Sequence, residues 1–109
     1  MADRPSETER KHLIREYQAL VTGITSIFFR MDPVGIALDD QNPDEYASEA
    51  AMIARFLPEA KDVDDLERAL REVFVRQFGE PLPGPMTQYR EIATEIWRFT
   101  AEVRKQAGR

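Results

Sequence analysis

The chain contains no cysteine among its 109 residues and only one histidine, His12. The missing cysteines exclude disulfide bonds, thiolate nucleophiles and cysteine-ligated zinc sites, and they suit a reducing cytoplasm. No apolar run approaches the roughly 18–20 residues that span a bilayer, and the first residues lack the apolar segment of a signal peptide. We therefore expect a cytoplasmic protein that makes no membrane contact.

The chain also contains fewer basic than acidic residues. Fifteen Lys and Arg residues face twenty Asp and Glu residues, which leaves a net charge of −5. This balance argues against nucleic acid as a partner, because phosphates favour clustered Lys and Arg, and it suits a basic protein instead. The length and the 42% apolar content predict a single folded domain over residues 1–109, with frayed ends at 1–5 and 105–109.

Strand patterns with alternating apolar residues are missing, and four helical patterns take their place. The first pattern follows a capping box that begins at Ser6, and it must stop by Asp32 because Pro33 disfavours a helical residue before it. Its apolar residues recur at steps of three and four and form one stripe. These residues are Leu13, Ile14, Tyr17, Leu20, Val21, Ile24, Ile27 and Phe28.

The other three helices are predicted from their start and stop signals. Asn42 is a preferred cap and Pro43 suits a first helical position, so the second helix should begin there and end at Pro58. The third should run from a cap at Asp62 to Gly79, and the fourth should begin near Thr87. The sequence therefore predicts an all-α fold: a compact bundle of four helices with a long ordered loop between the first two.

The third helix carries opposite charges at helical spacing, which predicts a solvated outer side. The opposite charges at this spacing are Glu67 with Arg71, Arg68 with Glu72, and Glu72 with Arg76. The second predicted helix, the short turn after it and the third predicted helix could together mimic a helix-turn-helix motif. A recognition helix, however, should present basic residues without interleaved acids. The pattern therefore predicts no binding to nucleic acid.

The segment between the first two helices, MDPVGIALDDQNPDEY over residues 31–46, contains no Lys or Arg. Its apolar centre should fold back onto the end of the bundle, and five residues are expected to shape the loop: Asp32, Pro33, Gly35, Asn42 and Pro43. Four acids should then be displayed without a local countercharge: Asp39, Asp40, Asp44 and Glu45. We predict that these four bind a basic protein partner.

Catalytic and metal-binding patterns are weak. The acids of this segment are hard oxygen ligands, but they lack the ligand spacing and the central glycine of an EF-hand loop. His12 lies among charged neighbours, which is typical of a surface residue. There is no Gly-rich phosphate loop and no nucleophile elbow. We therefore expect no catalytic residues, no metal site and no cofactor, and a metal-dependent enzyme is the least favoured alternative.

Short motifs along the chain resemble a family of short, all-helical bacterial proteins of unknown function. The motifs are D-P-V-G-I (32–36), D-E-Y (44–46) with E-A (49–50), V-F (73–74) and I-A-T-E-I-W (92–97). The resemblance covers roughly residues 20–100 and implies a bacterial origin and a helical fold, without any catalytic residues. Some proteins that look like this are suspected immunity proteins, which neutralise a toxin domain. The polar DDQN stretch and the long first helix depart from that family.

Two functional hypotheses follow from these observations. The first is a small non-catalytic binding domain, with an immunity-type inhibitor as the form that the resemblance implies, whose acidic segment covers a basic surface. The second is a structural module that forms a homodimer through spare apolar surface on the first and fourth helices.

Overall fold

A computed structural model describes residues 7–33, 46–82 and 87–106 of the chain. These residues form four α-helices, named α1 (Glu7–Met31), α3 (Ala47–Phe56), α4 (Val63–Phe78) and α5 (Thr87–Gln106). A short 3-10 helix, η1 (Leu57–Glu59), follows α3 directly. The described residues contain no strand, so the predicted all-α fold with four helices is confirmed. Among these helices, none combines the length and the apolarity needed to cross a membrane.

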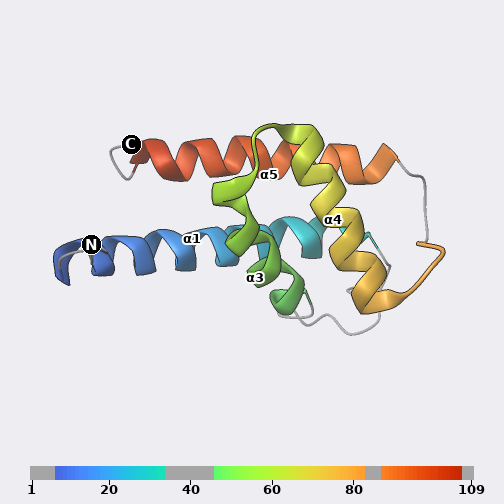
Figure 1. Ribbon diagram of the computed structural model, residues 1–109, viewed down its shortest axis with the longest axis horizontal. Coiled ribbons are helices and arrows are strands. Elements are labelled where there is room, and N and C mark those ends of the chain that lie inside the picture. The colour runs from blue at the N-terminus through green and yellow to red at the C-terminus, as the bar shows by residue number, and fades with distance from the viewer. Residues whose placement is uncertain (1–6, 34–45, 83–86, 107–109) are drawn as a thin grey trace, which may run out of the picture.

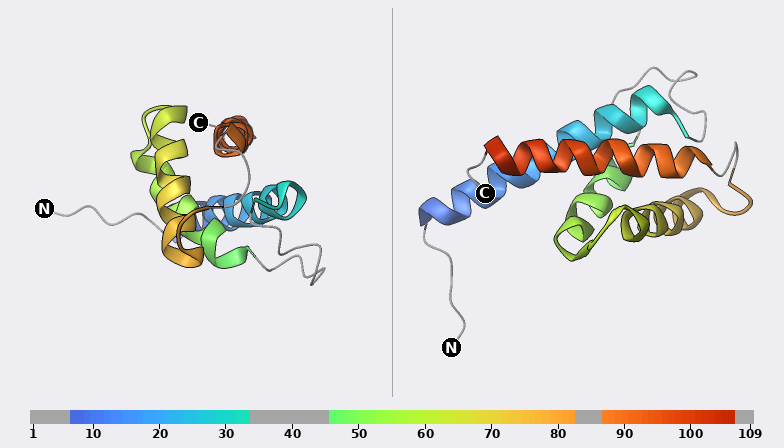
Figure 2. Two further views of the ribbon diagram at one scale, coloured as in Figure 1. Left: turned by 90° about the vertical axis from the view of Figure 1, so that its right-hand side faces the viewer. Right: turned by 90° about the horizontal axis from the view of Figure 1, so that it is seen from above.

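The helices form two layers. Helices α1 and α5 run antiparallel along the 45 Å length of the molecule, so that the start of α1 and the end of α5 lie at one end (Figure 1). Helices α3 and α4 form an antiparallel hairpin that crosses one face of this pair (Figure 2). The most extensive contacts join α1 to α3 and α5, and α4 to α3 and α5.

The ends of α4 follow the local signals in the sequence. Asp62 caps the helix, because its Oδ1 accepts a hydrogen bond of 2.9 Å from the Asp65 N–H. Asp65 in turn accepts a hydrogen bond of 3.0 Å from the Lys61 N–H through Oδ2, which completes a reciprocal capping arrangement. Gly79 ends the helix with φ of +84°, a left-handed conformation that glycine adopts at little cost. The predicted bounds of this helix are therefore confirmed.

The start of α3 differs from the prediction. Tyr46 lies in a turn and α3 begins at Ala47, whereas the sequence pattern placed the start at Pro43. Tyr46 provides no side-chain cap, so burial of its ring rather than a capping hydrogen bond marks this helix end. Helix α5 also continues to Gln106, which makes the beginning of the expected frayed end helical.

A cluster of aromatic rings in the core joins α1, α4, α5 and the turn that precedes α3. Phe74 of α4 lies at its centre: its ring centroid is 5.2 Å from Phe28 of α1, 6.0 Å from Tyr46 and 6.0 Å from Tyr89 of α5. Phe78 stacks on Phe74 with the ring centroids 5.6 Å apart. Edge-to-face and offset contacts of this kind add stability beyond the burial of area. Phe74 is therefore the residue through which the two layers are tied together.

The second layer covers only part of the first. On α1, every described side chain before Leu20 is exposed or half-buried, and on α5 no side chain after Thr100 is fully buried. Residues 7–19 of α1 and 101–106 of α5 thus extend beyond the α3–α4 hairpin (Figure 1). We call these two segments the arm.

Candidate protein-interaction surfaces

The four acids predicted to bind a basic partner lie outside the described residues, and so do three of the residues expected to shape the loop. These seven residues are Asp39, Asp40, Asp44 and Glu45, together with Gly35, Asn42 and Pro43. Their predicted roles therefore stay predictions.

Asp32 and Pro33 connect the end of α1 to the rest of the fold. Asp32 adopts a left-handed conformation with φ of +47°, and its N–H donates a hydrogen bond of 2.7 Å to the Phe28 carbonyl. The Tyr46 hydroxyl donates a hydrogen bond of 2.7 Å to Asp32 Oδ1. Pro33 is buried, and its carbonyl accepts a hydrogen bond of 3.2 Å from the side-chain amide of Gln88. The described part of the loop is thus held against both layers.

The arm exposes large apolar side chains. Leu13 is 43% exposed and Ile14 is 55% exposed, although both lie on the apolar stripe that continues into the core at Leu20 and Ile24. The stripe was expected to lie on one face throughout, and it does, but only its second half is buried. The reason is length: a helix of 25 residues is about 37 Å long, and the hairpin covers less than that.

A groove of 260 Å³ lies between α3 and α4. Its lining combines apolar residues with charged ones: Ile53, Phe56, Asp65, Arg68, Ala69, Glu72 and Val73. The groove lies beside the core, because its lining residue Ile53 is fully buried and Phe56, Ala69 and Val73 pack against the core cluster. Phe56, the last residue of α3, is half-buried in this groove.

The ion pairs of α4 only partly follow the helical spacing of its charges. Glu67 pairs with Arg71, but it also pairs with Arg90 of α5, so this part of α4 faces another helix rather than solvent. Arg68 pairs with Asp65 at 3.3 Å, not with Glu72. Within the described residues Glu72 makes no ion pair, with Arg76 or with any other residue. Which of several neighbouring charges a side chain pairs with depends on its rotamer and on residues of other helices. Helical spacing alone does not predict this choice.

Glu49 is buried in the core, with 4% of its surface exposed. Its Oε1 atom has no hydrogen-bond partner among the described residues. Burial removes water from the carboxylate and therefore raises the pKa of Glu49 above its ordinary value of 4.5, although a backbone hydrogen bond lowers it. A charged form that is poorly solvated costs free energy, so this residue destabilises the fold at neutral pH.

We predict that Glu49→Gln stabilises the protein at pH 7 by about 1 kcal/mol, because the buried group then carries no charge. The pKa of Glu49 is higher in the folded than in the unfolded protein. The wild type therefore has its full stability below pH 4.5 and loses part of it as the pH rises through the folded-state pKa of Glu49. The advantage of the variant should therefore disappear below pH 4.5, which urea denaturation of both proteins at each pH would measure. Glu91→Gln, at an exposed site on α5, is the matched control. An advantage of Glu49→Gln that is equal at both pH values would contradict this prediction.

In the described part of the chain, no group of three His, Cys, Asp or Glu side chains is placed so that it could hold a metal ion. The side chain of His12 lies outside the described residues. Tyr89 is buried and its pKa is raised by desolvation, and its ring packs in the aromatic cluster.

The groove and the buried Glu49 were not identified from the sequence, and the arm was anticipated only as spare apolar surface on the first and fourth helices. A signal existed for Glu49, because it lies three residues after Tyr46 and four before Ile53, at the spacing of a buried helix face. A signal also existed for the arm, since the first apolar stripe is much longer than the second helix. The groove had none, because it depends on the packing of α3 against α4.

Comparison of the chain with protein-family models, with curated proteins and with solved structures finds no match.

Proposed function

We propose that this chain is a non-catalytic protein-binding domain and that a partner covers the apolar side of its arm. The observation that carries the proposal is the exposure of Leu13 and Ile14 on a stripe that is otherwise the core face of α1. Both side chains are already about half covered, so complete burial of each would gain about 1 kcal/mol, and a partner that covers both gains roughly 2 kcal/mol of binding energy.

A single exposed leucine is ordinary in a soluble protein. Here two neighbouring large side chains continue an amphipathic pattern for two turns beyond the layer that buries it, and half-buried Tyr17 lies between them and the core. Polar residues at these positions would serve a solvated helix end equally well. Apolar residues that continue the pattern support a surface that is covered by another molecule.

The acidic segment supports a second contact surface. Asp39, Asp40, Asp44 and Glu45 fall in a stretch without Lys or Arg, in a chain of net charge −5. A basic partner would be steered to such a segment by electrostatic attraction. With the resemblance to suspected immunity proteins, this composition favours an inhibitor that covers the basic surface of a toxin-like protein.

Site-specific photo-crosslinking in the lysate of the native host tests the proposal. A benzophenone side chain would replace Ile14 on the apolar side of the arm, or Ala19 at an exposed position on the other side of α1. We expect a crosslinked protein from position 14 and none from position 19. The same bait with Asp39→Asn, Asp40→Asn, Asp44→Asn and Glu45→Gln should lose a basic partner at low salt if the acidic segment contributes. Absence of any crosslink at position 14 would remove the support for the arm.

A further inference from the structure

We infer that the partner of the arm is a second copy of this chain, and that the arm of one molecule docks into the groove between α3 and α4 of the next. The inference rests on the proposed function of the arm and adds the identity of the partner. It depends on two surfaces of one chain that match in shape, in polarity and in charge.

The arm supplies a protruding apolar ridge with a cation beside it. Arg10 precedes Leu13 and Ile14 by three and four residues, so the three side chains share one side of α1, and Tyr17 continues that side. Arg10 is exposed and makes no ion pair with any described residue. The ridge therefore offers two large aliphatic side chains and an uncompensated positive charge.

The groove supplies an apolar floor with an anion beside it. Ile53, Phe56, Ala69 and Val73 form the apolar part of the 260 Å³ space, which suits one or two large aliphatic side chains. Glu72 stands at its edge, exposed and without an ion pair among the described residues, while Asp65 and Arg68 at the edge neutralise each other. The groove therefore presents an apolar floor and an unpaired anion, which match the apolar side chains and the cation of the arm.

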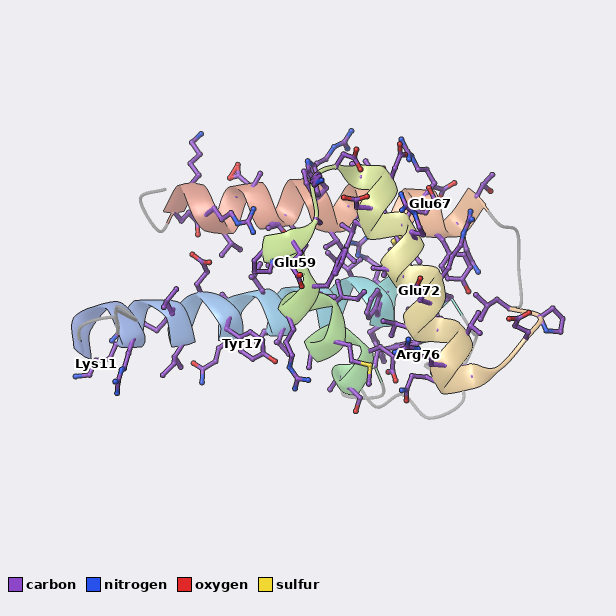
Figure 3. All side chains as sticks on the ribbon, viewed as in Figure 1. Lys11, Tyr17, Glu59, Glu67, Glu72 and Arg76 are labelled. Atoms are coloured by element: carbon purple, nitrogen blue, oxygen red, sulfur yellow. The ribbon has the colours of Figure 1, made fainter. Side chains whose placement is uncertain are left out.

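The two surfaces cannot meet within one molecule. Figure 3 shows Lys11 and Tyr17 on the arm at one end of α1, well apart from Glu72 on α4. Arm and groove lie on different elements of a rigid two-layer fold, so contact between them must join two molecules. The charge balance also differs between the two parts: residues 20–100 contain 15 acidic and 8 basic residues, whereas the arm (7–19 and 101–106) contains four acids and five bases.

A contact between two different surfaces is heterologous, and each bound molecule leaves one arm and one groove open. Association should therefore continue beyond the dimer as concentration rises, in open chains or in a closed ring. The contact area is small, so we expect weak association with a Kd of about 10⁻⁴ M.

The test uses variants that each block one surface. Ile14→Asp places a charge on the ridge, and Ala69→Glu places one on the groove floor. By sedimentation velocity up to about 1 mM, each variant alone should be a monomer of 12.6 kDa. A mixture of the two variants should form a 1:1 dimer and no larger species. Only the groove of the Ile14→Asp protein and the arm of the Ala69→Glu protein remain intact, so one contact can form. The wild type should instead grow beyond the dimer.

Charge reversal provides a second set of variants at exposed positions, where folding is not at risk. Arg10→Glu and Glu72→Arg should each weaken association at least about tenfold, and the protein carrying both changes should recover most of it. Circular dichroism would verify the helical content of every variant.

Three results would overturn the inference: a wild type that stays monomeric at all concentrations, a mixture without the 1:1 dimer, or a dimer that survives the groove variants and so joins arm to arm. A monomeric wild type that still crosslinks another protein at position 14 would contradict only the inference that the partner is a second copy of this chain. A monomer without any crosslink would remove the proposed function as well.

Discussion

Replacing Phe74 with alanine is expected to cost about 3–5 kcal/mol of unfolding free energy, the range found for large aromatic side chains in packed cores. Phe74 is fully buried and lies within 6.0 Å, centroid to centroid, of Phe28, Tyr46, Phe78 and Tyr89. Since domains of this size are stable by only about 5–15 kcal/mol, the variant should lose a large share of its stability. Thermal denaturation followed by circular dichroism should show a melting temperature lower by roughly 15–30 °C.

Phe78→Ala is the matched control for this prediction. Phe78 stacks on the same ring, but it is the last residue of α4 and 40% of its surface is exposed. Its loss leaves a surface depression that water can fill, so the expected cost is about 1 kcal/mol. Equal costs for the two substitutions would show that Phe74 does not hold the layers together.

Gly23→Val is expected to destabilise the protein by about 2–3 kcal/mol, although helix propensity alone favours valine over glycine by a few tenths of a kcal/mol. A Cβ atom added at Gly23 would lie only 2.0 Å from Cζ of Phe99 on α5, far inside van der Waals contact. The branched valine side chain has little freedom to turn away, so either the Phe99 ring leaves its place or α1 and α5 separate. Urea denaturation would measure the loss.

Two further variants isolate the cause of this effect. Thr22→Val changes an exposed neighbour on α1 and should alter stability by less than about 0.5 kcal/mol. In a Phe99→Ala background the space beside Gly23 is open, so adding Gly23→Val there should cost much less than in the wild type. An equally large cost in both backgrounds would rule out the contact with Phe99 as the reason.

The surfaces proposed for binding show where reasoning from sequence reached its limit. Leu13 and Ile14 were recognised as members of an apolar stripe, yet a stripe does not state how much of it a neighbouring helix covers. That depends on the crossing of the α3–α4 hairpin over α1 and α5, which involves residues far apart in the chain. The unpaired Glu72 likewise depends on Arg68 turning to Asp65, a choice among side-chain conformations that spacing leaves open.

By itself, the sequence determined the four helices and most of their ends. Asp62 as a cap, Gly79 as a left-handed stop and Pro33 after the last turn of α1 act through their own backbone geometry, so neighbouring residues suffice to predict them. Only the tertiary structure decided which apolar residues are covered, that Glu49 is buried, and that Gly23 meets Phe99. The physical reason is the range of the interactions: caps and stops act over a few residues, whereas burial depends on helices that meet only after the chain has folded.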